Sequence, residues 1–87
     1  MYLLKSFTLE DNNYRTVVTF DLFIKEGEPI LMESALESNG SSAVRTYYGY
    51  EDIFDRLWTL SLMSDHKVRR VINALRQCLI DERYGSK

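Results

Sequence analysis

The stretch that decides the fold is YRTVVTFDLFIK, residues 14–25. Apolar and polar side chains alternate along it, and this period of two is typical of a β-strand with one buried face. One face carries the mainly apolar set Tyr14, Thr16, Val18, Phe20, Leu22 and Ile24. The opposite face is mainly polar, but Val17 and Phe23 interrupt it. We therefore predict a strand whose second face is either partly covered or bears an apolar patch.

Three other stretches around this one also have the composition of strands. They are residues 1–9, 30–36 and 43–50. The turn signals between the four strands lie at residues 11–13, 26–29 and 38–42. The last of these contains Asn39-Gly40, which supplies the positive φ angles of a hairpin loop. Short connections between consecutive strands imply an antiparallel meander. Two sets should each share one strand face: Ile30, Met32 and Leu36, and Val44, Thr46, Tyr48 and Tyr50.

After Gly49 the apolar period changes from two to 3.6, which indicates helices. The first apolar stripe consists of Ile53, Phe54, Leu57 and Leu60. The second consists of Val68, Val71, Ile72, Leu75 and Leu79. Asp65 provides a cap between them, and Gly85 ends the second helix. Because residues 64–67 contain neither glycine nor proline, one kinked helix is the open alternative.

A sheet with one half-buried face needs a cover, and two amphipathic helices provide it. We therefore predict an α+β fold: an antiparallel four-stranded β-meander (β-β-β-β-α-α), covered on one face by two C-terminal helices. Residues 1–87 form a single domain, because the chain is too short for two. The predicted core consists of Phe20, Leu22, Leu57, Val71, Ile72 and Leu75.

Charge is sorted along the chain. Residues 21–55 contain eight acidic and two basic side chains, a net charge of −6, whereas residues 56–87 contain seven basic and three acidic ones, a net charge of +4. The first twenty residues balance, so the formal total is −2. A bipolar surface steers partners and orients them on docking, but it specifies neither a fold nor a reaction.

Composition and the lack of sorting signals indicate a soluble cytoplasmic protein. Hydrophobic residues make up 45% and charged residues 28% of the chain, the proportions of an ordinary globular domain. Cys78 is the only cysteine, so an internal disulfide is excluded. No apolar run approaches the roughly 18 residues of a membrane span, and the first residues do not resemble a secretion signal. We expect no membrane partner.

The sequence lacks motifs for catalysis or metal binding. His66, the only histidine, is predicted on the outside of the last helix, and Cys78 borders the apolar stripe without a nearby base. Glu51, Asp52 and Asp55 form one tight carboxylate group, although acids favour helix N-termini for electrostatic reasons alone. We therefore expect no catalytic residues, no cofactor and no metal. An enzyme or metal protein based on these three carboxylates remains a rival hypothesis.

Two groups of residues are candidates for partner binding. The arginine edge consists of Arg69, Arg76 and Arg83, which are seven apart and share one edge of the last helix. Such an edge is either solvated or docks an acidic partner. The second group comprises Tyr47, Tyr48, Tyr50, Glu51, Asp52 and Asp55.

Successive strand residues point to opposite faces of a sheet, so Tyr47 must lie on the face opposite to Tyr48. At least one tyrosine should therefore point away from the helices. With Val17 and Phe23, that tyrosine would form an aromatic and apolar patch rimmed by acids, which is characteristic of protein interfaces. Packing against a neighbouring strand or a homodimer partner is the alternative.

Together these features predict a small non-enzymatic protein that binds another protein or a protein complex. Its size and acidity favour an inhibitor or immunity-type factor, phage-encoded and directed against a host defence or regulatory complex. The less favoured alternatives are a nucleic-acid-binding accessory protein that uses the arginine edge, and a structural homo-oligomer subunit. The acidic balance of the whole chain, with a pI near 5.3, argues against nucleic acid.

Overall fold

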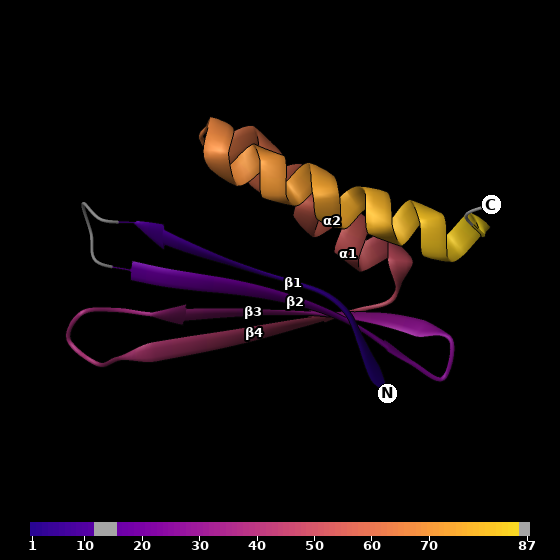
Figure 1. Ribbon diagram of the computed structural model, residues 1–87, viewed down its shortest axis with the longest axis horizontal. Coiled ribbons are helices and arrows are strands. Elements are labelled where there is room, and N and C mark those ends of the chain that lie inside the picture. The colour runs from indigo at the N-terminus through magenta and orange to yellow at the C-terminus, as the bar shows by residue number, and fades with distance from the viewer. Residues whose placement is uncertain (12–15, 86–87) are drawn as a thin grey trace.

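The computed structural model describes residues 1–11 and 16–85, which form a two-layer α+β fold (Figure 1). The strands are β1 (Tyr2–Asp11), β2 (Thr16–Lys25), β3 (Glu28–Leu36) and β4 (Ser42–Tyr48). Helices α1 (Tyr50–Met63) and α2 (His66–Tyr84) follow, and both lie on one side of the sheet. The predicted turn at Asn12 and Asn13 and the predicted strand start at Tyr14 lie outside the described residues. The predicted meander with two C-terminal helices is confirmed.

The four strands form one antiparallel sheet in the order β1-β2-β3-β4. The register places Leu22 opposite Leu31 and Phe20 opposite Glu33, so these residues share the face that the helices cover. The hairpin between β2 and β3 is tighter than the sequence predicts. Its turn is the dipeptide Glu26-Gly27, with φ angles of 52° and 81°. Two positive φ angles fit the twist of a two-residue hairpin, so β3 begins before Pro29 rather than at residue 30.

The fourth strand ends two residues earlier than predicted. Gly49 has φ 85° and ψ 156°, a conformation that favours glycine, and it turns the chain out of the sheet. Its N–H donates to the carbonyl of Pro29, and its carbonyl accepts from the N–H of Ile53. Tyr50 is therefore the first residue of α1, and the prediction that it shares a strand face with Tyr48 is wrong.

The C-terminal third contains two helices and not one kinked helix. The chain leaves α1 at Ser64, which has extended backbone angles. Asp65 then caps α2: its carboxylate accepts a hydrogen bond from the N–H of Val68 at 3.0 Å. Capping by a short acidic side chain satisfies one of the free N–H groups of the first turn. Neither described helix combines the length and apolarity required to cross a membrane.

The core lies between the covered sheet face and the helix pair. The fully buried side chains, including one proline, are Leu22, Leu31, Ile53, Leu57, Ile72, Leu75, Leu79 and Pro29. Five of the six predicted core residues are buried, Phe20 among them. Val71 is the exception, because it packs at the margin of the cluster and stays half-buried. Leu31 and Pro29, which are the contribution of β3 to the core, were not among the predicted core residues.

Candidate protein-interaction surfaces

The three predicted tyrosines lie on different surfaces. Tyr47 faces the helices, and the guanidinium of Arg56 lies 5.4 Å from its ring centre. Tyr48 points the other way and is 64% exposed, so the prediction of one tyrosine away from the helices is confirmed. Tyr50 opens α1, where its ring stacks on Phe54 with centroids 6.4 Å apart. The tyrosines therefore do not form one continuous patch.

The environment of Tyr50 ties the start of α1 to the end of α2. The guanidinium of Arg83 lies 5.1 Å from the ring centre of Tyr50. Burial, followed by the carboxylates of Glu82 and Glu28, raises the pKa of the Tyr50 phenol, and Arg83 partly opposes this effect. The phenol therefore stays neutral, and its ring serves as a packing surface.

The acidic residues Glu51, Asp52 and Asp55 occupy the exposed first turns of α1. Carboxylates in this position interact favourably with the helix dipole. In the described part of the chain, no group of three or more histidine, cysteine or carboxylate side chains is arranged to hold a metal ion. These acids form an exposed negative surface that is on a different element from Tyr47 and Tyr48.

The arginine edge is partly occupied by contacts with α1. The Nε of Arg69 donates to the carbonyl of Ser61 at 3.1 Å. Arg83 lies over Tyr50 and also over Tyr84, 5.7 Å from that ring centre. Arg76 is exposed and has no such contact among the described residues. Two of the three predicted docking residues therefore help to hold the helix pair together.

The uncovered face of the sheet carries a row of apolar side chains across all four strands. The register pairs Leu3 with Phe23, Phe23 with Ile30, and Ile30 with Tyr48. We call Leu3, Phe23, Ile30 and Tyr48 the apolar row. Leu3 is 51% and Tyr48 64% exposed, and no described element packs on this side of the sheet (Figure 1).

Only part of this row was predicted from the sequence. Phe23 and an outward tyrosine were identified, and Ile30 was grouped with Met32 and Leu36 without an assigned face. Val17, the other predicted member of the patch, lies on the same face but six register pairs from Phe23, opposite Leu36. The full row could not be predicted without the register of the strands. Hairpin turn length sets this register, because it decides which residues of neighbouring strands stand opposite each other.

Acidic side chains outnumber basic ones around the apolar row. A shallow hollow beside Ile30 and Tyr48 is bordered by Glu26, Glu28 and Lys25. Asp21 belongs to the same sheet face, where its carboxylate accepts a hydrogen bond from Ser6. Three carboxylates and one ammonium group thus surround the row, which makes its rim negative.

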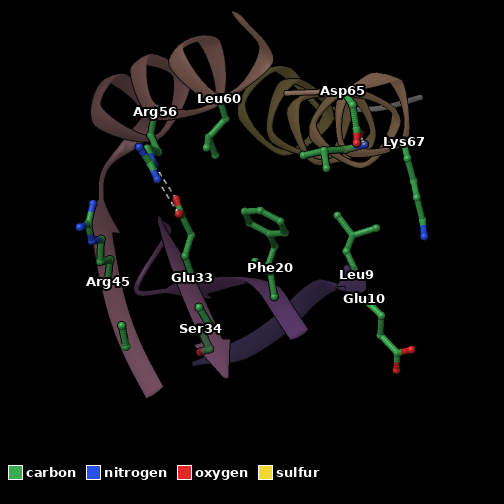
Figure 2. A pocket seen from close by; sticks show the side chains of 14 residues that line it. Leu9, Glu10, Phe20, Glu33, Ser34, Arg45, Arg56, Leu60, Asp65 and Lys67 are labelled. Atoms are coloured by element: carbon green, nitrogen blue, oxygen red, sulfur yellow. Dashed lines mark hydrogen bonds and ion pairs between the residues drawn. The ribbon is translucent and has the colours of Figure 1, made fainter. Parts of the chain in front are cut away.

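The helix side of the sheet contains a cleft of about 730 Å³ near the connection between α1 and α2. Figure 2 shows Phe20 on its floor, Leu60 on its roof, and the ion pair of Arg56 with Glu33 at one side. Two hydrogen bonds join this pair, from Nε at 2.8 Å and from a terminal nitrogen at 2.9 Å. The hydrogen bonds with Glu33 raise the pKa of Arg56, although partial burial acts against them.

Comparison of the chain with protein-family models, curated proteins and solved structures gives no match. The apolar row and the cleft are therefore the features of the molecule that indicate a function.

Proposed function

We propose that this protein acts by binding another protein through the uncovered face of its sheet, with no catalysis of its own. The supporting observation is the apolar row, which crosses all four strands. An antiparallel sheet that faces water on one side normally alternates apolar and polar residues, so that its outer face is polar. Exposed apolar side chains that form a contiguous set are characteristic of interaction sites.

The chemistry of the rim selects the kind of partner. Asp21, Glu26 and Glu28 give the surroundings of the row a negative charge that Lys25 only partly offsets. Complementary charge around an apolar centre increases the association rate and disfavours wrong partners. The occupant is therefore a foreign protein with an apolar centre and a basic rim.

The finer form of this proposal is an inhibitor or immunity-type factor. It would be encoded by a phage and directed against a host defence or regulatory complex. Its support comes from the sequence: 87 residues, a formal charge of −2 and no catalytic motif. The nucleic-acid alternative is weakened, because Arg69 and Arg83 of the arginine edge are engaged with α1.

The test compares two exposed aromatic residues on different surfaces. Tyr48 on the sheet and Trp58 on α1 are each 64% exposed, so neither substitution should unfold the protein. The partner is captured from the native host, purified and titrated with the parent protein, Tyr48→Ser and Trp58→Ser. We expect Tyr48→Ser to weaken binding by a factor of about 10 or more, as for an interface anchor. Trp58→Ser should bind as the parent does.

Two results would overturn the proposal. One is an affinity that depends on Trp58 and not on Tyr48. The other is a parent protein that is dimeric by light scattering and becomes monomeric on Tyr48→Ser, because the row would then be covered by a second copy of this chain.

A further inference from the structure

The last strand of the sheet leaves one of its edges unpaired. In the order β1-β2-β3-β4, β4 is bonded to β3 alone, and no described strand lies beyond it (Figure 1). Its register with β3 runs without a bulge from Ser42 to Tyr48. The edge at β1 differs, because a register shift interrupts it between Leu3 and Lys5. Bulges and lysines protect an edge from pairing with another chain, so β4 is the unprotected edge of the sheet.

The hydrogen bonds between β3 and β4 show which main-chain groups are free at this edge. Gly49, one residue after β4, donates its N–H to the carbonyl of Pro29. In an antiparallel pair the bonds to one neighbour come from every second residue, so the odd-numbered residues of β4 also bond β3. The even-numbered residues, Val44, Thr46 and Tyr48 among them, therefore point their N–H and C=O groups away from the sheet.

The sequence of β4 complements itself when two copies pair antiparallel about Thr46. Val44 then stands opposite Tyr48 of the second copy on the uncovered face, and these side chains are 59% and 64% exposed in one copy alone. On the helix side, Arg45 stands opposite Tyr47 of the second copy. Threonine opposite threonine and an aromatic residue opposite a β-branched one are favourable cross-strand pairs. A pairing about Arg45 would instead place two like charges opposite each other, which is destabilising.

The helix layer leaves room for a second copy beside β4. In the register about Thr46, Ala43 stands opposite Gly49 of the second copy, where α1 of that copy begins. Ala43 and Ala35 line the cleft, so the inner face of the sheet is open at this point. The first turn of α1 from one copy therefore meets the open half of β4 in the other copy, without a helix in its way.

Charge complementarity joins the same two parts. Arg45 forms no ion pair with a described residue, since Glu33 opposite it bonds Arg56. Figure 2 shows the Arg45 side chain on the outer side of β4, away from Glu33. Asp52 is exposed and lies one turn before Arg56, whose guanidinium contacts Tyr47. Residues four apart share one side of a helix, so Asp52 lies on the side of α1 that faces the free edge of β4.

We propose that the protein forms a homodimer in which the β4 edges of two copies pair antiparallel, with a two-fold axis at Thr46. The two four-stranded sheets become one continuous sheet. Arg45 of each copy pairs with Asp52 of the other. The uncovered face of both copies stays open, so the dimer leaves the apolar row free for the foreign partner proposed above.

The first test measures the mass of the parent protein and the exchange of its edge amides. Sedimentation equilibrium of the full chain should show a reversible monomer–dimer equilibrium. Where the dimer predominates, the amide hydrogens of Val44, Thr46 and Tyr48 should exchange about tenfold more slowly than in dilute protein, because pairing protects them from water. The amide of Tyr47, which bonds β3 in both states, should change less.

Two substitutions at one position separate the main chain from the side chain. Thr46→Pro removes the N–H at the two-fold axis and should weaken dimerisation at least about tenfold. The monomer should stay folded, because that N–H does not bond β3 and proline is tolerated in this position of an edge strand. Thr46→Val keeps the N–H and should dimerise like the parent. Tyr48→Ser should also remain dimeric, because it leaves the main-chain groups of the edge in place.

A charge exchange tests the ion pair in protein whose main-chain edge is unchanged. Arg45→Glu and Asp52→Lys should each weaken dimerisation about tenfold, because each places like charges beside one another. The double variant restores the opposite charges and should dimerise like the parent. Arg76→Glu reverses an exposed charge on α2, away from β4, and should leave the dimer unchanged. Thermal unfolding of each variant verifies the fold.

Several outcomes would overturn this inference: a parent that stays monomeric, a dimer whose edge amides remain unprotected, a dimer that survives Thr46→Pro, or a double charge variant no better than the single ones. Edge amides protected only by a bound foreign protein would assign the edge to a strand of that protein. A dimer lost on Tyr48→Ser and kept on Thr46→Pro would place the second copy on the apolar row, which would contradict the proposed function as well. Partner titrations of Tyr48→Ser test that function separately.

Discussion

Glu33 marks the point at which the inner face of β3 changes from apolar to charged. Leu31, two residues earlier, is fully buried, whereas Glu33 brings a carboxylate beside Phe20. A charge in this position requires a partner, because desolvation of an unpaired carboxylate is costly. Arg56 provides it from α1, 23 positions along the chain, and its guanidinium also covers the ring of Tyr47. Sequence periodicity cannot reveal such a pair, because nothing local links the two residues.

Substitution of Glu33 by glutamine should destabilise the protein. The change keeps the shape of the side chain but leaves Arg56 without its counter-ion, and the two side chains are only 11% and 21% exposed. We expect a loss of roughly 1–3 kcal/mol, between the values for exposed and buried pairs. Urea unfolding measures it, with Glu37→Gln in the β3–β4 connection as the control. Equal unfolding midpoints for the two variants would show that the pair contributes nothing.

At the scale of elements, periodicity predicted where the chain forms strands and helices but not every face. In β2 the apolar residues fall mainly on one face, and in α2 they form one stripe with a period of 3.6 residues, so burial follows directly from the pattern. In β3 both faces carry apolar residues: Ile30 and Met32 lie on one face and Leu31 on the other, so the pattern alone does not indicate which face is buried. Only the register with β2 resolves this, since Leu31 stands opposite buried Leu22.

The junction between the sheet and α1 depends on Gly49. Its φ of 85° and ψ of 156° lie in a region essentially restricted to glycine. Gly49→Ala should therefore cost about 1–3 kcal/mol through backbone strain alone. A steric clash makes no contribution, because a Cβ built on Gly49 meets nothing within 4 Å.

Thermal or urea unfolding measures this cost, with Asp55→Ala on the exposed side of α1 as the control, which should change stability by less than about 0.5 kcal/mol. A Gly49→Ala protein as stable as the parent would mean that the junction tolerates another backbone conformation.

The whole molecule presents different chemistry on its two sides. The uncovered sheet face carries the apolar row and an acidic rim, whereas the helix side carries the cleft and the arginine edge. The cleft exists because the inner face has small or charged residues toward the β3–β4 hairpin, including Ala35, Ala43 and Arg45. Such side chains cannot fill the space between sheet and helices with apolar volume, whereas Leu22 and Leu31 belong to the buried core cluster.

The uneven distribution of charge along the chain should affect the association rate of a basic partner. Glu51, Asp52 and Asp55 are exposed on α1 and lie outside the apolar row, so their reversal to lysine changes the long-range field without removing an anchor. We expect association to slow about tenfold at low salt while dissociation stays unchanged, because charges outside the buried contact act mainly on the association rate.

A variant with the opposite change completes this experiment. Arg70→Glu with Arg76→Glu makes the exposed side of α2 acidic, and neither residue takes part in the contacts that Arg69 and Arg83 make with α1. This variant should bind a basic partner faster than the parent does. Stopped-flow measurements at increasing salt should bring all three rates together, because the screening length falls from about 10 Å at 0.1 M to about 3 Å at 1 M. Equal rates for the three proteins at low salt would mean that the charge sorting only keeps the surface solvated.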